Sequence, residues 1–314
     1  MSGLNSLLTL DPSLEQHDSK VSSGGTVRAY SHDTGSGPVL CLVHGWPQSA
    51  FMWRHVIPMI KSKYTLYIPE LPGYGISSLP PKPDKRTVGK LIIEGLQSVF
   101  GTSRKVIWCG HDRGGRVGHR LIVDNDPAHN ITSAMLWDIV PTWEQWKAFS
   151  NPLAATAYYH WPFLATTTAP QMIEMMGGYE YIKMNLERVK GQNPAGVAKF
   201  RENDAIDHYA GVFRHPEAIS GSCADYHAGA FEDVDEQKKD QEAGKKVGIP
   251  TFVGYSASNL GRMHDVESLW PEWADGKAEL KLVGIPDGYG HYLPEECPDQ
   301  IARLIVEWMD KHGK

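Results

Sequence analysis

Six short apolar segments recur along the chain and are separated by stretches long enough to form helices. They are rich in β-branched and aromatic residues and do not alternate strictly between apolar and polar positions, which is typical of strands covered on both faces. Strands that alternate with helices predict an α/β fold with a mostly parallel sheet and flanking helices. The expected strands are PVLCLVHG (38–45), YTLYIPE (64–70), KVIWCGH (105–111), ITSAMLWD (131–138), IPTFVGYS (249–256) and AELKLVGI (278–285).

The alternation breaks between residues 139 and 248. This stretch is rich in Trp, Tyr, Met and His and predicts mainly helices, so we interpret it as a helical cap inserted into the α/β core. The expected domains are a first part of the core (1–138), the cap (139–248) and a second part of the core (249–314). Residues 1 to about 20 predict an extension that packs on the surface or frays.

Composition narrows the class of protein. The 314 residues carry a formal charge of −6 without a long run of one sign, so neither nucleic acid nor an anionic membrane is expected as a partner. The sequence has no apolar run long enough to cross a bilayer and no signal-peptide pattern at its start. Four isolated cysteines favour buried free thiols in a reducing compartment, so we expect a cytoplasmic protein. We expect no metal and no cofactor.

The segment CGHDRGGR (109–116) predicts a strand, a sharp turn and a helix, with Asp112 at the tip of the turn. Such a turn forces the residue at its tip into an uncommon backbone conformation and requires small neighbours, which Gly110 and Gly114 supply. Asp112 could instead cap the helix, but a cap does not explain the glycines on both sides. We therefore predict that Asp112 is a catalytic nucleophile.

A base and an orienting acid are expected at neighbouring strand ends. His291 follows the last expected strand and precedes the final helix, where it can activate a water; the alternative is an ordinary loop histidine. Asp138 directly follows the strand ITSAMLW, whereas no carboxylate follows IPTFVGYS until Asp265. We choose Asp138 as the acid that orients His291, with a turn aspartate before Pro141 as the structural alternative.

The nucleophile type selects the chemistry. A carboxylate is a poor nucleophile toward esters and amides, but it can displace a leaving group from an sp³ carbon and form an ester of the protein. Water activated by His291 would then attack the carbonyl of that ester, and the backbone N–H groups of Trp46 and Arg113 would hold the oxyanion. Asp112 therefore indicates carbon–halogen or epoxide cleavage and argues against an esterase or a peptidase.

Arg113 and Arg116 lie three residues apart at the start of the same helix. Two guanidinium groups beside a nucleophile can hold a substrate carboxylate. They could instead balance the charge of Asp112 or pair with acids elsewhere. We expect a small, anionic substrate.

Several motifs are similar to those of one family, the haloacetate dehalogenases of the α/β-hydrolase fold, fluoroacetate dehalogenases in particular, which are related to the epoxide hydrolases. In chain order, from about residue 35 to the C-terminus, the motifs are HGWPQS, LPGYG, GHDRGGR, DIVPT, YHWPF, DYHAGAF and GHYLPEECPDQ. The resemblance implies the roles already given to Asp112, His291, Asp138 and the two arginines. It adds three donors to the departing halide, which are His160, Trp161 and Tyr226.

The sequence departs from the family at a few positions. Val189 stands where a tryptophan is expected in fluoroacetate dehalogenases, the N-terminal extension is longer, and VGYSASNLGRMHDV differs in detail. These differences bear on the substrate more than on the chemistry.

Three functions follow from the pattern. The leading one is hydrolysis of the carbon–halogen bond of a small 2-halo carboxylate. The second is an epoxide hydrolase with the same Asp, His and Asp, in which Tyr226 together with Tyr158 or Tyr159 would protonate the epoxide oxygen. The third is a small-molecule-binding scaffold without turnover. The sequence leaves open whether the protein forms a homodimer.

Overall fold

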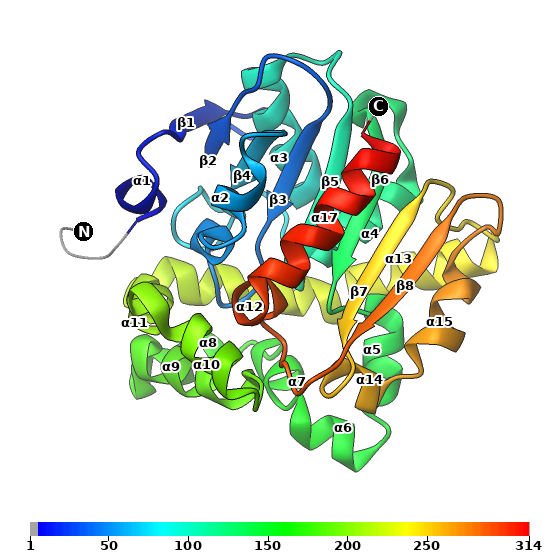
Figure 1. Ribbon diagram of the computed structural model, residues 1–314. Helices are drawn as coiled ribbons and strands as arrows, with labels where there is room; N and C mark the ends of the chain where they lie inside the picture. Colours follow the sequence, from blue (N-terminus) through cyan, green and yellow to red (C-terminus); the bar gives the residue numbers. More distant parts are fainter. Residues whose placement is uncertain (1–5, 314) are drawn as a thin grey trace.

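A computed structural model describes residues 6–313 and contains one eight-stranded sheet (Figure 1). The strand order is β1-β2-β4-β3-β5-β6-β7-β8; the six strands from β4 to β8 in this order are parallel, and β1 and β2 are antiparallel to their neighbours. The strands are β1 Glu15–Lys20, β2 Thr26–His32, β3 Val39–Val43, β4 Thr65–Pro69, β5 Val106–His111, β6 Ile131–Trp137, β7 Thr251–Ser256 and β8 Leu280–Ile285.

The six parallel strands are the six that the apolar segments predict, with ends that differ by at most two residues. The prediction missed β1 and β2. The expectation of an extension that packs on the surface or frays is wrong for Glu15–Lys20, because this segment forms the edge strand beside β2. The segment EQHDSK is mostly exposed and polar, so it carries no hydrophobic signal. Residues 1–5 of that extension lie outside the described residues.

Helices cover both faces of the sheet (Figure 1). The short α2 and the C-terminal α17 lie on the face turned to the viewer, and α3 and α4 lie on the other. The core helices are α1 Leu7–Leu10, α2 Ile57–Ile60, α3 Lys85–Phe100, α4 Arg113–Asp124, α14 Leu260–Met263, α15 Val266–Trp273, α16 Leu293–Glu296 and α17 Pro298–His312, with 3₁₀ turns at Ala50–Trp53 and Pro127–His129. Within residues 6–313, none of the helices has the length and hydropathy needed to cross a membrane.

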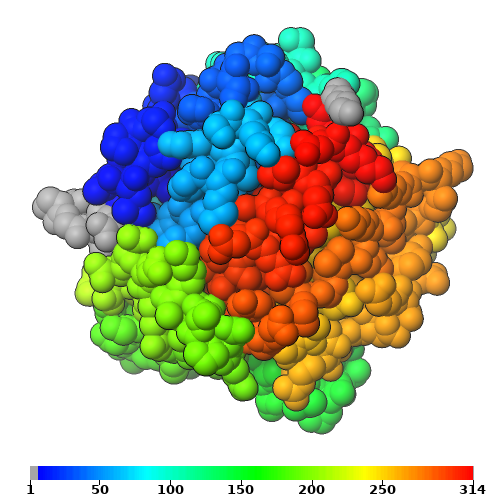
Figure 2. All heavy atoms as spheres, in the orientation of Figure 1, coloured from blue at the N-terminus to red at the C-terminus, as the bar shows by residue number. Residues whose placement is uncertain are grey.

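Most of the helices between β6 and β7 lie below the sheet in Figure 1, at the ends of strands β5 to β7, whereas the last one lies beside α4 at the level of the sheet. These helices are α5 Thr142–Ala148, α6 Pro152–Ala157, α7 His160–Leu164, α8 Ala169–Met176, α9 Gly178–Val189, α10 Pro194–Arg201, α11 Ala205–Val212, α12 Pro216–Ala230 and α13 Glu232–Glu242, with a 3₁₀ turn at Glu202–Asp204. In Figure 2 the yellow-green atoms of this segment lie directly against the red atoms near the C-terminus.

The last of these helices, α13, packs on the core. Asp240 forms an ion pair with Arg120 of α4 at 2.5 Å, and Asp233 forms one with Lys85 of α3 at 3.1 Å. All four side chains are almost fully buried. The predicted cap (139–248) therefore ends with a helix, α13, that ion pairs attach to the core.

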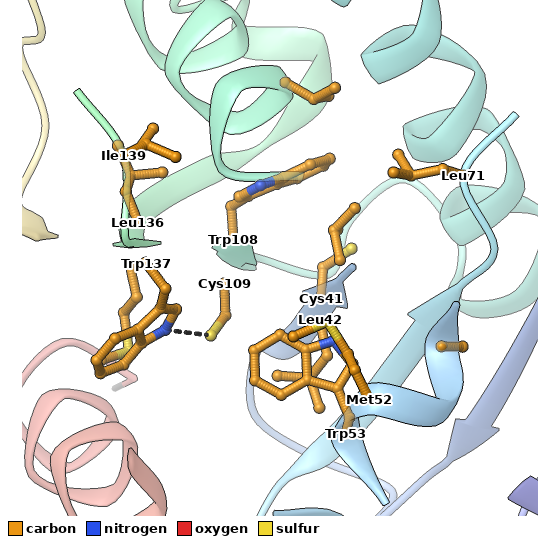
Figure 3. Packing of buried hydrophobic residues seen from close by; sticks show 14 of the residues in the cluster. Cys41, Leu42, Met52, Trp53, Leu71, Trp108, Cys109, Leu136, Trp137 and Ile139 are labelled. Carbon is orange, nitrogen blue, oxygen red and sulfur yellow. Dashed lines mark hydrogen bonds between the residues drawn. The ribbon is translucent and has the colours of Figure 1, made fainter. Parts of the chain in front are cut away.

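The core beneath the turn at residue 112 is built from large side chains of β3, β5 and β6 (Figure 3). The Trp137 indole N–H donates to the Cys109 sulfur at 3.3 Å, and the Trp108 indole N–H donates to the Gly114 carbonyl at 2.9 Å. This second bond ties the first turn of α4 to β5. All four cysteines are within the described residues and are buried and free, as the sequence predicts.

Candidate active site

Asp112 occupies a strained turn between β5 and α4. Its φ and ψ are 45° and −113°, a combination that costs roughly 1–3 kcal/mol in a residue with a side chain. The backbone holds it on both sides, because the Asp112 N–H donates to the Trp137 carbonyl at 3.1 Å and the Arg116 N–H donates to the Asp112 carbonyl at 2.9 Å. A Cβ at Gly110 would overlap the Gly114 carbonyl. Glycine at position 110 is therefore a requirement of the turn.

The loop after β3 brings a backbone donor to the carboxylate. The Trp46 N–H donates to Asp112 Oδ2 at 3.0 Å. A Cβ at Gly45 would lie 2.6 Å from the Asp112 Cβ, so the two loops approach this closely only because residue 45 is glycine. The Arg113 N–H opens α4, where N–H groups have no partner within the helix. The two N–H groups that we predict as an oxyanion hole thus flank Asp112.

The Asp112 carboxylate is only 4% exposed and is surrounded by positive charge. Burial raises its pKa, but the charges of His291, Arg113 and Arg116 outweigh burial and lower the pKa to about 2. Asp112 is therefore ionised at neutral pH, which is the state that a nucleophile needs.

The side chains of His291 and Asp138 lie in contact, as we predict from their positions after strands of the sheet. His291 Nδ1 lies 2.6 Å from Asp138 Oδ2, and Asp138 Oδ1 accepts the Ser256 N–H at 2.7 Å. Asp138 directly follows β6 with a φ of 53°. Burial lowers the pKa of His291, but the hydrogen bond and the charge of Asp138 raise it by more, and the net pKa lies above the ordinary value. This bond leaves Nε2 of His291 free to take a proton.

The loop that carries His291 is fixed from several sides. The His291 N–H donates to the Val189 carbonyl at 3.2 Å, and His111 donates its Nε2–H to the His291 carbonyl at 2.8 Å. The buried Glu296 carboxylate accepts N–H groups from Gly290 at 2.7 Å and from Gly191 at 3.1 Å. The end of α9 and the histidine loop are therefore joined through one carboxylate.

A small cavity, about 30 Å³, lies between the core and the cap helices. It brings together all of the predicted triad and halide-site residues, and it also includes Arg116 and Trp46. The lining residues are Trp46, Asp112, Arg116, Asp138, Gln145, Tyr158, His160, Trp161, Val189, Tyr226, Asn259, Leu260, His291 and Tyr292. Tyr159 is not among the lining residues.

The three predicted halide donors lie around one another on α7 and α12. The Tyr226 ring is 5.4 Å from that of Trp161 and 6.1 Å from that of His160. Arg188 donates to His160 Nδ1 at 2.8 Å, and burial together with Arg188 keeps the pKa of His160 well below its ordinary value. His160 is therefore neutral, with its proton on Nε2.

The two predicted carboxylate-binding arginines differ in their surroundings. Arg113 forms a buried ion pair with Asp225, Nε to Oδ2 at 2.5 Å, and its side chain does not line the cavity. Arg116 does line the cavity. Its Nη1 donates to the Val140 carbonyl at 2.8 Å, its Nε has no hydrogen-bond partner, and it has no acidic partner within residues 6–313. Burial and the charge of Arg113 lower the pKa of Arg116 to about 10, so it remains charged at neutral pH.

Sequence reasoning missed two supporting residues, Asp225 and Arg188. Asp225 lies next to Tyr226 and holds both Arg113 and Lys85, the latter at 2.6 Å. The sequence signal that could have indicated Asp225 is its place beside Tyr226 in the motif DYHAGAF. Arg188 stands in KMNLERVKG, where nothing in the local pattern relates it to His160, 28 residues earlier.

The family follows from comparison with known proteins. A model described as the alpha/beta hydrolase family matches residues 40–304. The chain belongs to the α/β-hydrolase family. This hydrolase is 32% identical to the fluoroacetate dehalogenase of a Burkholderia species over 285 residues, which cover 88% of each chain. It is 31% identical to the soluble epoxide hydrolase of Corynebacterium sp. (strain C12), over 87% of this chain and 91% of that protein.

Solved structures agree on the fold of this hydrolase. A candidate epoxide hydrolase from Pseudomonas aeruginosa superposes with a TM-score of 0.81 at 27% identity, over 96% of this chain and 97% of that one. The predicted α/β-hydrolase fold is therefore confirmed, and the relatives include both a dehalogenase and epoxide hydrolases.

Proposed function

We propose that this hydrolase cleaves the carbon–halogen bond of a small 2-halo carboxylate, R–CHX–COO⁻. The observation that carries the proposal is Arg116, a buried cation that lines the cavity of Asp112 and has no acidic partner in the described part of the chain. Arg116 interacts with the charge of Asp112 but forms no direct ion pair, so its free donor N–H groups can bind a carboxylate of the substrate. A carboxylate on Arg116 would hold the neighbouring carbon near Asp112.

In the first step, a carboxylate oxygen of Asp112 attacks the halogen-bearing carbon from the side opposite the halogen. The carbon–halogen bond breaks, its electron pair leaves with the halide, and an ester of Asp112 forms with inversion. The N–H groups of His160 and Trp161 and the hydroxyl of Tyr226 are the donors that receive the halide. They replace part of its hydration in a small cavity.

In the second step, His291 removes a proton from water, and the resulting hydroxide attacks the ester carbonyl. The N–H groups of Trp46 and Arg113 hold the oxyanion, and Asp138 stabilises the imidazolium. Collapse of the intermediate breaks the bond between the Asp112 carbonyl carbon and the ester oxygen, which came from Asp112 and leaves with the product. The products are the 2-hydroxy acid and free Asp112, so that each turnover consumes one water and releases one halide and one proton.

Epoxide hydrolysis is the second candidate, because Tyr158 and Tyr226 both line the cavity. Two phenols in the cavity of the nucleophile are suited to protonating an epoxide oxygen. The Tyr158 hydroxyl is buried without a hydrogen-bond partner, so it is available for that role. With a neutral epoxide, Arg116 would serve only to keep Asp112 ionised and would bind no group of the substrate.

A substrate panel tests the assignment. The purified protein is incubated with fluoroacetate, chloroacetate, 2-chloropropionate, chloroacetamide and styrene oxide, and halide, hydroxy acid and diol are quantified. We expect stoichiometric halide and hydroxy acid from the halo acids and slower turnover of the amide. Diol formation without halide release would assign the protein to the epoxide hydrolases, and tight binding without any turnover would favour a binding scaffold.

A further inference from the structure

A second and larger cavity, about 440 Å³, adjoins the active-site cavity. The two cavities share three lining residues, Tyr158, Val189 and Asn259, which come from the α6–α7 connection, the end of α9 and the loop after β7. The inner cavity is small, and these three residues form the wall that it shares with the outer cavity. The outer cavity is the space that adjoins them.

Val189 has a fixed position in this shared wall. Its carbonyl accepts the His291 N–H at 3.2 Å, so the backbone at residue 189 cannot shift without moving the loop of His291. The side chain at position 189 is part of the wall that the two cavities share, so we expect its size to set how far a substrate can extend from one cavity into the other. Valine is short and fills less of the space at this shared wall than a large aromatic residue would.

The outer cavity is positively charged. Its lining residues include Arg188, Lys190 and Arg262 and no Asp or Glu. Lys190 is neutralised by Glu187 at 2.9 Å. Arg188 donates to two oxygens and to His160 but forms no ion pair, and the Arg262 side chain is exposed without an ion pair within residues 6–313. Two uncompensated guanidinium groups thus lie on the wall beyond Val189.

We propose that the R group of the substrate passes Val189 into the outer cavity and carries a second anionic group, which Arg262 and Arg188 recognise. The substrate class is then the 2-halo dicarboxylates and similar 2-halo acids with an anionic side chain. The proposal rests on the function proposed above. Arg116 would bind the carboxylate next to the reacting carbon, and the outer arginines would bind the distal one.

The test compares 2-chlorosuccinate with 2-chlorobutanoate, which has the same chain length but no second carboxylate. We expect kcat/KM to be at least about tenfold higher for chlorosuccinate, the scale of one charge-assisted hydrogen bond. Val189→Trp should lower the ratio of kcat/KM for chlorosuccinate over chloroacetate by about tenfold or more. Arg262→Gln should lower the chlorosuccinate to chlorobutanoate ratio.

Matched controls separate local from general effects. Met184→Trp adds the same side chain at an exposed position of α9, and Arg303→Gln removes an exposed arginine of α17; both should leave all ratios unchanged. Equal kcat/KM values for chlorosuccinate and chlorobutanoate in the wild type would overturn the proposal. So would an Arg262→Gln effect of equal size on every halo acid, since that result indicates only long-range attraction.

Equilibrium binding distinguishes this proposal from the proposed function. Succinate and butanoate are titrated into the protein, and binding is followed by tryptophan fluorescence. Tighter binding of succinate that Arg262→Gln removes supports the outer subsite, even if no halo acid is turned over and the dehalogenase assignment fails. Turnover of halo acids with equal binding of succinate and butanoate would leave the dehalogenase assignment intact and reject the subsite.

Discussion

Replacing Arg116 by Met removes the one cavity-lining cation that lacks an acidic partner in the described residues. Methionine keeps much of the apolar volume that packs on Trp161, whose ring lies 4.3 Å from the guanidinium carbon. Loss of a charge-assisted hydrogen bond costs about 1.5–3 kcal/mol, and about 1.4 kcal/mol is a factor of ten, so kcat/KM for chloroacetate should fall about 10- to 150-fold.

A second substrate isolates the carboxylate contact. Chloroacetamide has the same reacting carbon but no charge, so Arg116→Met should lower its kcat/KM much less than that of chloroacetate. Arg116→Lys keeps the charge without the planar fork and should give an intermediate loss. Arg116→Met also loses the hydrogen bonds to Val140 and Thr142, so thermal unfolding of this variant is measured in parallel. Equal losses on chloroacetate and chloroacetamide would refute the proposed contact.

The remaining predictions concern the two chemical steps. After many turnovers in H₂¹⁸O, mass spectrometry should find ¹⁸O in the Asp112 carboxylate; label in the product alone would mean that water attacks the substrate directly. His291→Ala should accumulate a covalent ester on Asp112, and an active variant without adduct would give the base role to another group. His291 must be neutral to act as a base, and Asp138 raises its pKa, so activity should fall as the pH drops through a value above about 6.5. Asp138→Asn should lower kcat and move this fall in activity to lower pH. A pH profile that does not move would contradict the pairing of Asp138 with His291. Trp161→Phe should slow release of fluoride more than of chloride and epoxide opening least, whereas equal losses in all three rates would leave Trp161 a packing role only.

The sequence predicts the parallel sheet because its strands are buried and therefore apolar. It also predicts which side chains meet, because residues that directly follow parallel strands share one edge of the sheet. Asp112 and Asp138 follow β5 and β6, and His291 follows β8 after a short loop. The polar edge strand Glu15–Lys20 carried no such signal, and β2 was missed with it.

The surroundings of the arginines could not be predicted in the same way. Arg113 and Arg116 look equivalent at one helix start, but their environments depend on a partner 112 residues away, Asp225, which reaches Arg113 and not Arg116. The outer cavity likewise combines four separate segments, and no local pattern relates Arg188 to Arg262. Such contacts are products of tertiary packing.

The hydrogen bonds of Glu296 limit how this protein can be re-engineered by exchanging caps. Its carboxylate joins Gly191, at the end of the cap helix α9, to Gly290 beside the catalytic histidine, and a Cβ at Gly191 would overlap that carboxylate. A chimera that carries the cap of another hydrolase would therefore misplace His291 unless the graft supplies a glycine and a free N–H at this position. A workable recombination boundary must leave residues 189–191 with the core.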